Sequence, residues 1–410
     1  MGEQRTQSPV LPVEAATLVG PAPDAPHHLP MPPVPGALLM PFSGVRYDPE
    51  VVGDVGALLA PPHTELSQSE RAHRMEASPY AVTRLERPEN SPGPGPGILR
   101  WLHAGAVRED RPGFYVVRQR QQDRLHAFLL AALRVGPATD HRIQAHEATM
   151  GDVVVNRAGR LSATRVDSEP VLLLDETAGL AGDAVLAPER WGRRVLQTRT
   201  PDAEPVDVEV WHISDAERCG ALMQDLAPRR PLIADGHHRY AAARHLAGQG
   251  ENRLLVALAI QEATPVDVLS LHRVAPLRAA DALRAHADSV RPLLDETDPV
   301  VAQLSLDTAE VILATREGSQ VLRIPAHHIT GAAAWTDGVL HACGVENRQV
   351  RYVPDVAASL RSVSGHHLTV LLPPTALPEI RAVLAEGHLL SRKSTSFRPK
   401  PLAGPVLRLR

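Results

Sequence analysis

The sequence is poor in cysteine and has no long apolar run. Cys219 and Cys343 are the two cysteines in 410 residues, too few and too isolated for a disulfide framework or a Cys-x-x-Cys metal site. No window approaches 18 uninterrupted apolar residues, which argues against a membrane-spanning helix. The first residues also lack the basic start and apolar core of a secretory signal. We therefore expect a cytoplasmic protein without a membrane partner.

Lysine is rarer still for a chain of this size. Of the 43 basic residues, Lys393 and Lys400 are the two lysines and the others are arginine. This bias suggests that arginine is used wherever a generic positive charge suffices. Because both lysines lie in one short segment near the C-terminus, we expect that segment to have a function.

Charge and composition exclude several classes of protein. The net charge is −4 and the sequence pI is about 6.6, which disfavours a dedicated binder of nucleic acid or anionic membranes. The apolar fraction of 43% supports a packed core, and the length allows two or three domains. The composition leaves the oligomeric state open.

The chain divides into three predicted regions. Residues 1–36 are rich in proline and alanine and are predicted to be disordered, because they cannot bury enough apolar area to offset their ordering entropy. Residues 37–278 are expected to form the functional core and residues 279–410 a further C-terminal α/β lobe. Strand and helix patterns alternate over most of this length, which predicts a mixed α/β, or α+β, fold.

One stretch of the core stands out, from Arg230 to Ala243. Its apolar residues 232–234 predict a buried strand, Asp235 and Gly236 form a turn pair, and a helix is predicted to follow and to end near Gly248. With the apolar run 253–260, it predicts a strand–helix–strand unit. The first turn of a helix favours anions such as phosphate. The alternative is an ordinary helix cap in which Asp235 satisfies its own backbone.

Several further motifs occur with this stretch in one order along the chain. Together they resemble the domain-of-unknown-function family numbered 1015, whose hallmark is Asp-Gly-His-His-Arg-Tyr. The matching stretches are Pro41–Phe42, Val45–Tyr47, Ala60–Pro62, His146–Thr149, Asp235–Tyr240, His272–Arg273 and Lys393–Lys400.

The chain departs from the family pattern at three places. After Pro62 the family usually has Tyr-Asp, where this chain has His63 and Thr64. The lysine and aspartate expected after the His-Glu motif are not clearly present, and Arg157, Gly159 and Arg160 stand there. Ser270-Leu271 replaces a usual Pro-Thr. These departures predict a different substrate or a reduced activity.

The Asp-Gly-x-His-Arg pattern also resembles the phosphate-binding element of the ParB/sulfiredoxin superfamily, which includes free-serine kinases that use ADP or ATP. The resemblance implies a ParB/sulfiredoxin-like core, a nucleotide-phosphate site at Asp235 to Arg239, and phosphoryl transfer as the chemistry. It also implies that residues 391–403 pack back on the site.

Phosphoryl transfer needs an anion cradle, a divalent ion and a base. Backbone N–H groups of Gly236, His237 and His238, with the Arg239 guanidinium, are the expected cradle. Asp235 is the expected Mg²⁺ ligand, and it is predicted to be catalytic together with Glu147 and His237. Glu147 is the candidate base.

The remaining predicted site residues supply binding groups. His146, beside Glu147, is expected to orient the substrate. The expected phosphate ligands are His272, Arg273, Lys393, Ser394, Thr395 and Lys400, with Ser396 as a further hydroxyl donor. Surface turns are the alternative for His272 and Arg273. Zinc is disfavoured, because adjacent histidines normally diverge and no cysteine pair supports it.

These observations favour a Mg²⁺-dependent kinase that phosphorylates a small hydroxyl compound, such as free serine, from ADP or ATP. The alternative is a nucleotide-binding regulator or scaffold of the ParB type, without a small-molecule acceptor. A third is a degenerate member with a structural role. The site assignment is tested by whether Glu147, His272, Lys393 and Lys400 converge on the helix start at Asp235.

Overall fold

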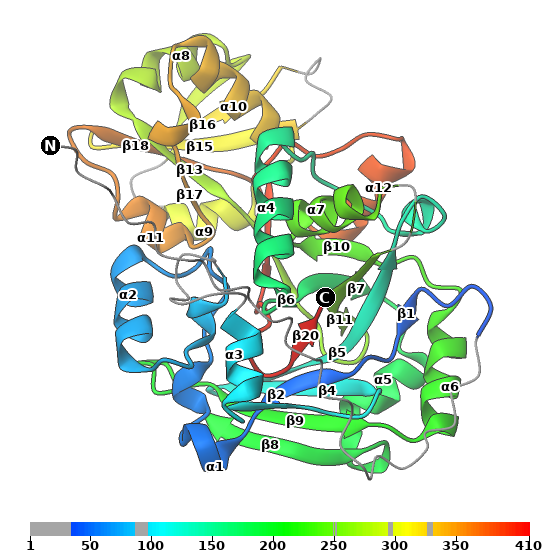
Figure 1. Cartoon of the computed structure of the whole chain (residues 1–410). Coiled ribbons are helices and arrows are strands. Elements are labelled where there is room, and N and C mark those ends of the chain that lie inside the picture. Colours follow the sequence, from blue (N-terminus) through cyan, green and yellow to red (C-terminus); the bar gives the residue numbers. More distant parts are fainter. Residues whose placement is uncertain (1–33, 87–96, 249, 251, 294–297, 326–330) are drawn as a thin grey trace, which may run out of the picture. The chain divides into compact units, whose positions relative to one another are not determined.

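A mixed, mainly antiparallel sheet lies beneath the predicted site (Figure 1). It is seen in a computed structural model that describes residues 34–86, 97–248, 250, 252–293, 298–325 and 331–410. The order of its strands is β10 (Leu232–Asp235), β7 (Val171–Asp175), β11 (Asn252–Ile260), β5 (Arg124–Val135), β4 (Phe114–Gln121), β9 (Asp207–Ile213) and β8 (Arg193–Arg199), with β1 (Leu39–Met40) paired to β5.

The sequence accounts for the centre of this sheet. Strands β5 and β11 are apolar runs, buried along most of their length, as expected for strands covered on both faces. The sequence patterns of residues 113–118 and 125–135 are typical of paired strands, and β4 and β5 form an antiparallel hairpin there. The strand–helix–strand prediction is also confirmed, although β7 lies between β10 and β11.

Helices α4 (Gly151–Thr164) and α7 (His237–Ala247) lie side by side (Figure 1), and α7 packs on β11, β5 and β7. Gly248 follows the last residue of α7, as predicted. Five other helices come before β11 in the chain: α1 (Pro49–Val52), α2 (Gln68–Ala77), α3 (Gly97–His103), α5 (Gly179–Leu186) and α6 (Ala216–Leu226). The structure also has 3₁₀ turns at Gly56–Leu58, Val82–Arg84, Asp140–Arg142, Pro188–Arg190, Leu277–Ala279 and Asn347–Gln349.

Two small sheets join the end of the chain to the core. One has the order β3 (Val107–Glu109), β2 (Gly44–Tyr47), β20 (Leu407–Leu409) and β6 (Val166–Asp167), and the other pairs β12 (Asp267–Ser270) with β19 (Thr395–Arg398). The β12–β19 ladder is antiparallel. Through it, the segment that carries both lysines runs beside the core strands.

A six-stranded sheet contains most of the later strands. Its order is β14 (Ser289–Pro292), β16 (Gly318–Arg323), β15 (Glu310–Thr315), β18 (His367–Leu371), β13 (His272–Pro276) and β17 (Arg351–Val353). Its associated helices are α8 (Ala280–Ala285), α9 (Pro299–Leu304), α10 (Gly331–Ala342), α11 (Val356–Leu360) and α12 (Leu377–Ala385). One apolar cluster of this region surrounds the buried Trp335.

The mixed α/β fold class is confirmed, but one element differs from expectation. The sequence pattern predicts a helix from residue 279 to about residue 294, but α8 ends at Ala285, and Ser289–Pro292 pairs with β16 instead. Tertiary pairing here outweighs local helix propensity. The predicted loop at residues 91–97 lies almost entirely, and the predicted tail at 1–36 largely, outside the described residues. The division at residue 278 stays a prediction; β13, which precedes it, belongs to the six-stranded sheet.

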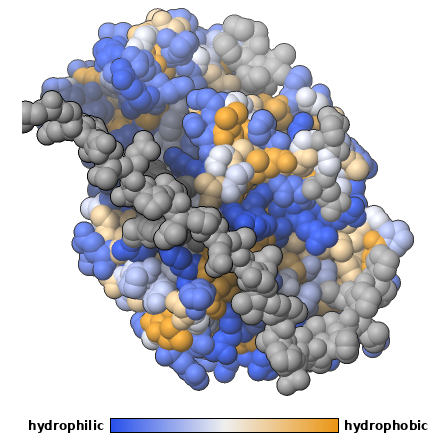
Figure 2. Space-filling model, in the orientation of Figure 1, coloured by the Kyte–Doolittle hydropathy of each residue, from blue (hydrophilic) through white to orange (hydrophobic). Residues whose placement is uncertain are grey.

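The surface is mostly hydrophilic on the face drawn in Figure 2, with hydrophobic residues in small separate patches. Within the described parts of the chain, no helix combines the length and apolarity needed to cross a membrane.

A buried carboxylate anchors β20 beside β6. Asp167, 3% exposed, accepts hydrogen bonds from Arg408 (2.7 Å), Arg410 (2.6 Å) and the Leu255 N–H (3.0 Å). We predict that Asp167→Asn lowers the free energy of unfolding by about 3–5 kcal/mol, because it breaks a buried ion pair and leaves two guanidinium groups without their charge partner. Urea unfolding at pH 7 measures this.

Asp207→Asn is the control, because Asp207 pairs with Arg199 at 3.0 Å on the surface, where both side chains are largely exposed. Exposed ion pairs contribute little. Equal losses in the two variants would contradict the anchoring role of Asp167.

Candidate functional site

The predicted turn lies where β10 meets α7. Residues 232–234 are buried, and the chain then turns through Gly236 in the left-handed region (φ +97°) before α7 begins at His237. A Cβ atom at Gly236 would lie 3.0 Å from Val171 Cγ2, so glycine suits both the backbone angle and the close approach. No side chain caps α7, so the alternative of an Asp235 cap is wrong. The positive end of the helix stays open.

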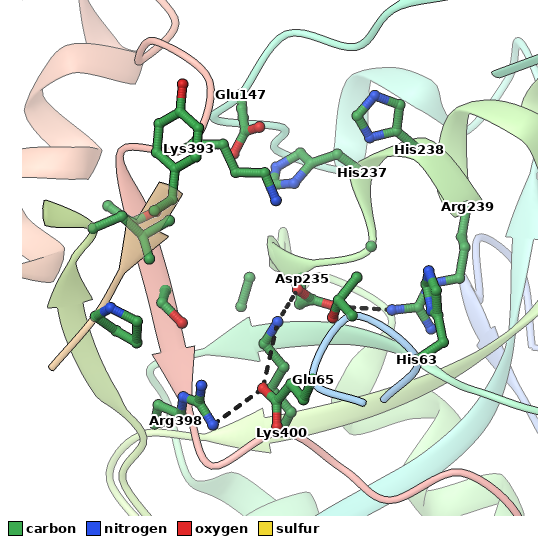
Figure 3. Close-up of a pocket in the computed structure, with 18 of the residues that line it drawn as sticks. His63, Glu65, Glu147, Asp235, His237, His238, Arg239, Lys393, Arg398 and Lys400 are labelled. Atoms are coloured by element: carbon green, nitrogen blue, oxygen red, sulfur yellow. Dashed lines mark hydrogen bonds and ion pairs between the residues drawn. The ribbon is translucent and has the colours of Figure 1, made fainter. Parts of the chain in front are cut away.

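Asp235 is instead held between two cations (Figure 3). Its Oδ1 accepts from Lys400 Nζ at 2.7 Å and its Oδ2 from Arg239 Nη2 at 2.8 Å. Burial by itself would raise the pKa of Asp235, but Lys400 and Arg239 outweigh it and hold that pKa below its usual value. One of the two lysines of the sequence therefore reaches the predicted turn.

A pocket of about 240 Å³ opens over this corner. Its lining comes from six separate parts of the chain and is rich in charged and histidine side chains (Figure 3). The residues that line it are His63, Thr64, Glu65, Glu147, Arg157, Ala234, Asp235, Gly236, His237, His238, Arg239, Leu271, Tyr352, Pro354, Lys393, Thr395, Ser396, Arg398 and Lys400.

Glu147 and two histidines form one wall of the pocket. Burial raises the pKa of Glu147 above its ordinary 4.5, and Lys393 partly offsets this. Burial lowers the pKa of His146 to about 4 and that of His237 to about 3, so both rings are neutral near pH 7. The rings meet edge to face at 4.5 Å, and His237 Nε2 is buried without a hydrogen-bond partner among the described residues.

The C-terminal segment supplies the opposite wall. Lys393, Thr395, Ser396 and Lys400 line the pocket, and Thr395 Oγ1 lies 3.1 Å from His146 Nε2. The antiparallel ladder of β12 with β19 holds this segment in place. Ser394 does not line the pocket, and its hydroxyl donates to the Ser391 carbonyl at 2.6 Å.

The predicted ligands His272 and Arg273 lie outside the pocket lining. His272 is buried, and its Nδ1 accepts the Leu372 N–H at 3.1 Å. Arg273 is fully buried and donates to Asp337 at 2.9 and 2.6 Å. Its guanidinium also lies 5.1 Å from the ring centre of Tyr352, which does line the pocket. Their observed contacts are internal to the fold.

Arg239 is also largely committed to internal partners. Besides Asp235, its guanidinium donates to the carbonyls of Glu169 and Pro170 and lies 3.0 Å from the Glu169 carboxylate. His238 lines the pocket while its Nε2 accepts the Met150 N–H, at 3.4 Å, at the start of α4. Phosphate binding by Arg239 and His238 stays a prediction.

Two of the family departures, His63 and Arg157, lie together in the pocket lining. His63 Nδ1 is 2.8 Å from Glu169 Oε2, and Arg157 Nη2 donates to His63 Nε2. Because Glu169 also pairs with Arg239, the two departing residues connect to Asp235 through a continuous charged network.

Sequence reasoning missed Glu65, Arg398 and Tyr352. Glu65 Oε1 lies 3.1 Å from Arg398 Nη1 and 3.8 Å from Lys400 Nζ (Figure 3). Arg398 lies inside the recognised C-terminal motif, so its position was the available signal. Glu65 follows the family match at Ala60–Pro62 in a loop without periodicity, and nothing in the pattern marked Tyr352.

The residues present do not form a magnesium site of their own. Within the described ranges, no group of three or more His, Cys, Asp or Glu side chains could hold a metal ion. Both oxygens of Asp235 face cations, so Mg²⁺ would have to bind this carboxylate beside Lys400 and Arg239, which repel it. The Mg²⁺ assignment stays a prediction.

The fold and the pocket define a mixed α/β protein with a cation-lined pocket at a strand-to-helix corner. The chain belongs to the family described as "Protein of unknown function (DUF1015)", which matches residues 39–320. This confirms the resemblance seen in the sequence motifs.

Solved structures with a similar fold share little sequence with this chain. Free serine kinase in complex with AMP is 12% identical with a TM-score of 0.42, covering 68% of this chain and 91% of that one. SbnI with a C-terminal truncation, from Staphylococcus aureus, is 13% identical with a TM-score of 0.40, covering 67% and 87%. TM-scores this low carry no argument about the superfamily or the activity of this chain. Comparison with curated proteins finds no match.

Glu169 makes the stability of this network depend on pH. Burial would raise the pKa of Glu169, but Arg239 and His63 hold it at about 2, below the ordinary 4.5. A carboxylate with a depressed folded-state pKa stabilises the fold above its unfolded pKa, and this contribution is lost as the pH falls through the folded value. We predict that Glu169→Gln costs about 3 kcal/mol at pH 7, and that the deficit shrinks between pH 4.5 and pH 2.

Urea unfolding over this pH range tests the prediction, with Glu317→Gln at an exposed position as the control. A deficit that stays constant from pH 7 to pH 3 would show that the Glu169 charge is not responsible.

Proposed function

We propose that the pocket binds the phosphate groups of ADP or ATP and transfers a phosphoryl group to the hydroxyl of a small compound such as free serine. The observation that carries this proposal is the open, uncapped start of α7 in a pocket that also contains several cations and the half-buried Glu147. Such a helix start binds anions, and a carboxylate of raised pKa suits proton transfer near neutral pH.

Phosphate binding is assigned to the turn and to the C-terminal segment. The first N–H groups of α7, which no side chain caps, and the glycine turn provide hydrogen-bond donors beside the Arg239 guanidinium. Lys393 Nζ has no hydrogen-bond or ion-pair partner within the described part of the chain, so its charge is available to an anion. Arg157 and Arg398 add two guanidinium groups to the lining. Together these groups offset the charge of a di- or triphosphate.

The chemical step joins an acceptor oxygen to the terminal phosphorus. The hydroxyl oxygen forms the new P–O bond, the bond to the bridging phosphate oxygen breaks, and AMP or ADP leaves with the electron pair. Glu147 takes the hydroxyl proton. Its pKa, raised by burial, makes it a better proton acceptor than an exposed glutamate.

His146 and His237 are assigned to orienting the acceptor and not to neutralising phosphate charge. Because burial keeps both rings uncharged, neither supplies a cation to the phosphates. His237 lines the pocket with an unpartnered Nε2, which can accept or donate one hydrogen bond to the acceptor. His146 fixes this ring through their edge-to-face contact. Mg²⁺, when bound to the nucleotide, would offset phosphate charge.

The proposal predicts a phosphorylated product when the protein is incubated with Mg²⁺, each nucleotide and a panel of hydroxyl amino acids. Glu147→Gln should lower the rate about 10²–10⁴-fold while nucleotide binding persists, because a base is lost and the phosphate ligands remain. Asp235→Asn should weaken nucleotide binding, because Lys400 and Arg239 lose the charge that positions them. Mass spectrometry of the product and calorimetric titration of ADP and ATP measure these effects.

Glu317→Gln is the matched control, at an exposed position outside the pocket. Tight nucleotide binding with hydrolysis and no phosphorylated acceptor would replace the kinase by the regulatory alternative. No acceptor, together with unchanged nucleotide binding in Asp235→Asn, would end the proposal.

The rate should also depend on pH through Glu147. The base acts in its ionised form, so kcat/KM should fall as the pH drops through the raised pKa of Glu147, above 4.5. The backbone N–H of Lys393 and, after it, the Lys393 ammonium hold that pKa down; Lys393→Met removes the ammonium alone and should move the midpoint to higher pH. Arg316→Met, at an exposed turn, should leave the midpoint in place. An increase in KM without a shift of the midpoint would restrict Lys393 to phosphate binding.

A further inference from the structure

A second cavity lies on the other side of the segment that carries Lys393. Its volume is about 380 Å³, and its walls come from the start of α10, the chain after β18, helix α12 and residues 388–395. Most of the lining is apolar, including Ala332, Leu372, Ile380, Val383 and Leu390. Small-molecule sites are concave, mainly apolar and of about this size, roughly 300–1,000 Å³.

The charges around this cavity differ from those of the phosphate pocket. Its described lining contains two carboxylates, Glu379 and Glu386, one histidine, His388, and neither lysine nor arginine. Glu379 also accepts the Ala376 N–H at 3.3 Å. Such a lining disfavours phosphate and carboxylate ligands, because an anion would meet two carboxylates and neither an ammonium nor a guanidinium group. It suits a small apolar compound that carries an amine.

The two cavities share a wall. Thr395 lines both, and its Oγ1 lies 3.1 Å from His146 Nε2. Leu390, on the apolar side, donates its N–H to the His146 carbonyl at 2.8 Å and pairs as an isolated β-bridge with Glu147. A molecule that touches Leu390 and Thr395 therefore touches the residues that hold the candidate base.

The backbone of this wall is also unusual at Lys393. This residue has φ +58°, in the left-handed region that non-glycine residues rarely adopt. Neighbouring Ser394 lines the apolar cavity while Lys393 lines the phosphate pocket. The Leu271 N–H donates to the Ser394 carbonyl at 3.1 Å. A shift of the Ser394 side of the wall thus changes the position of the Lys393 ammonium.

We propose that the apolar cavity binds a small apolar amine and that its occupation changes the affinity of the phosphate pocket for anions. Binding in the cavity stands apart from the proposed kinase function, whereas the coupling rests on anion binding in the phosphate pocket. Coupling between two sites is reciprocal and typically about 5- to 150-fold in affinity.

Binding is tested with 4-fluorobenzylamine and the full chain, followed by fluorine NMR line broadening. We expect saturable binding to the unaltered protein and loss of binding in Val383→Trp, which fills the cavity. Ala382→Trp is the matched control, because Ala382 is the exposed neighbour on α12 and does not line the cavity. Ala333→Leu fills the cavity from α10 and serves if Val383→Trp does not fold. The anionic probe 4-fluorobenzoate should bind more weakly.

Coupling is tested by calorimetric titration of inorganic pyrophosphate with and without saturating 4-fluorobenzylamine. The dissociation constant for pyrophosphate should change at least about fivefold in the unaltered protein and in Ala382→Trp, and not in the cavity-filling variants. Unaltered pyrophosphate affinity in the presence of bound amine would overturn the coupling.

The proposed amine site would be overturned by any of three results: no binding of 4-fluorobenzylamine, equal binding to the cavity-filling variants, or tighter binding of 4-fluorobenzoate. Failure of pyrophosphate to bind at all would count against the proposed function and the coupling, while the NMR experiment still decides whether the cavity binds an amine.

Discussion

The ion-pair array of Lys400, Asp235 and Arg239 is the interaction on which the pocket depends. Removing a carboxylate from water costs free energy unless its oxygens are paired with cations. In Asp235 each oxygen has its own cation. Arg239 comes from the same helix turn, whereas Lys400 comes from 165 residues further along the chain. The array therefore fixes the turn and at the same time binds the C-terminal segment to it.

The same array sets the ionic character of the site. Arg239 is neutralised by Asp235 and Glu169, and Lys400 by Asp235. The positive charge left for a ligand comes mainly from Lys393 and Arg157, because the histidines of the pocket are kept neutral by burial. Asp235 positions the Lys400 ammonium at the edge of the pocket, which links ligand binding to the position of the C-terminal segment.

The sequence predicted the local elements better than the contacts between them. The apolar run before Asp235, the glycine turn and the helix that ends before Gly248 follow from local rules, and the structure has them all. The prediction that Lys400 lies near Asp235 came from the family motifs and from the scarcity of lysine. Pairing of β12 with β19 joins segments more than a hundred residues apart, and no local pattern specifies such a ladder. The polarity of His272 and Arg273 suggested phosphate ligands. In the structure, both side chains are instead hydrogen-bonded inside the region of the six-stranded sheet.

The departures from the family pattern take on a different meaning in three dimensions. Read along the chain, His63 and Arg157 are two unrelated losses, which would favour a degenerate protein. In the structure the two side chains contact each other, and His63 also contacts Glu169, which is the partner of Arg239. Burial holds the pKa of His63 below its usual value, so the pair adds one positive charge, from Arg157, to the pocket wall. Random decay would leave buried charges without partners at such positions, whereas here the replacements satisfy one another. This arrangement supports a pocket adapted to a different ligand over one that has lost its function.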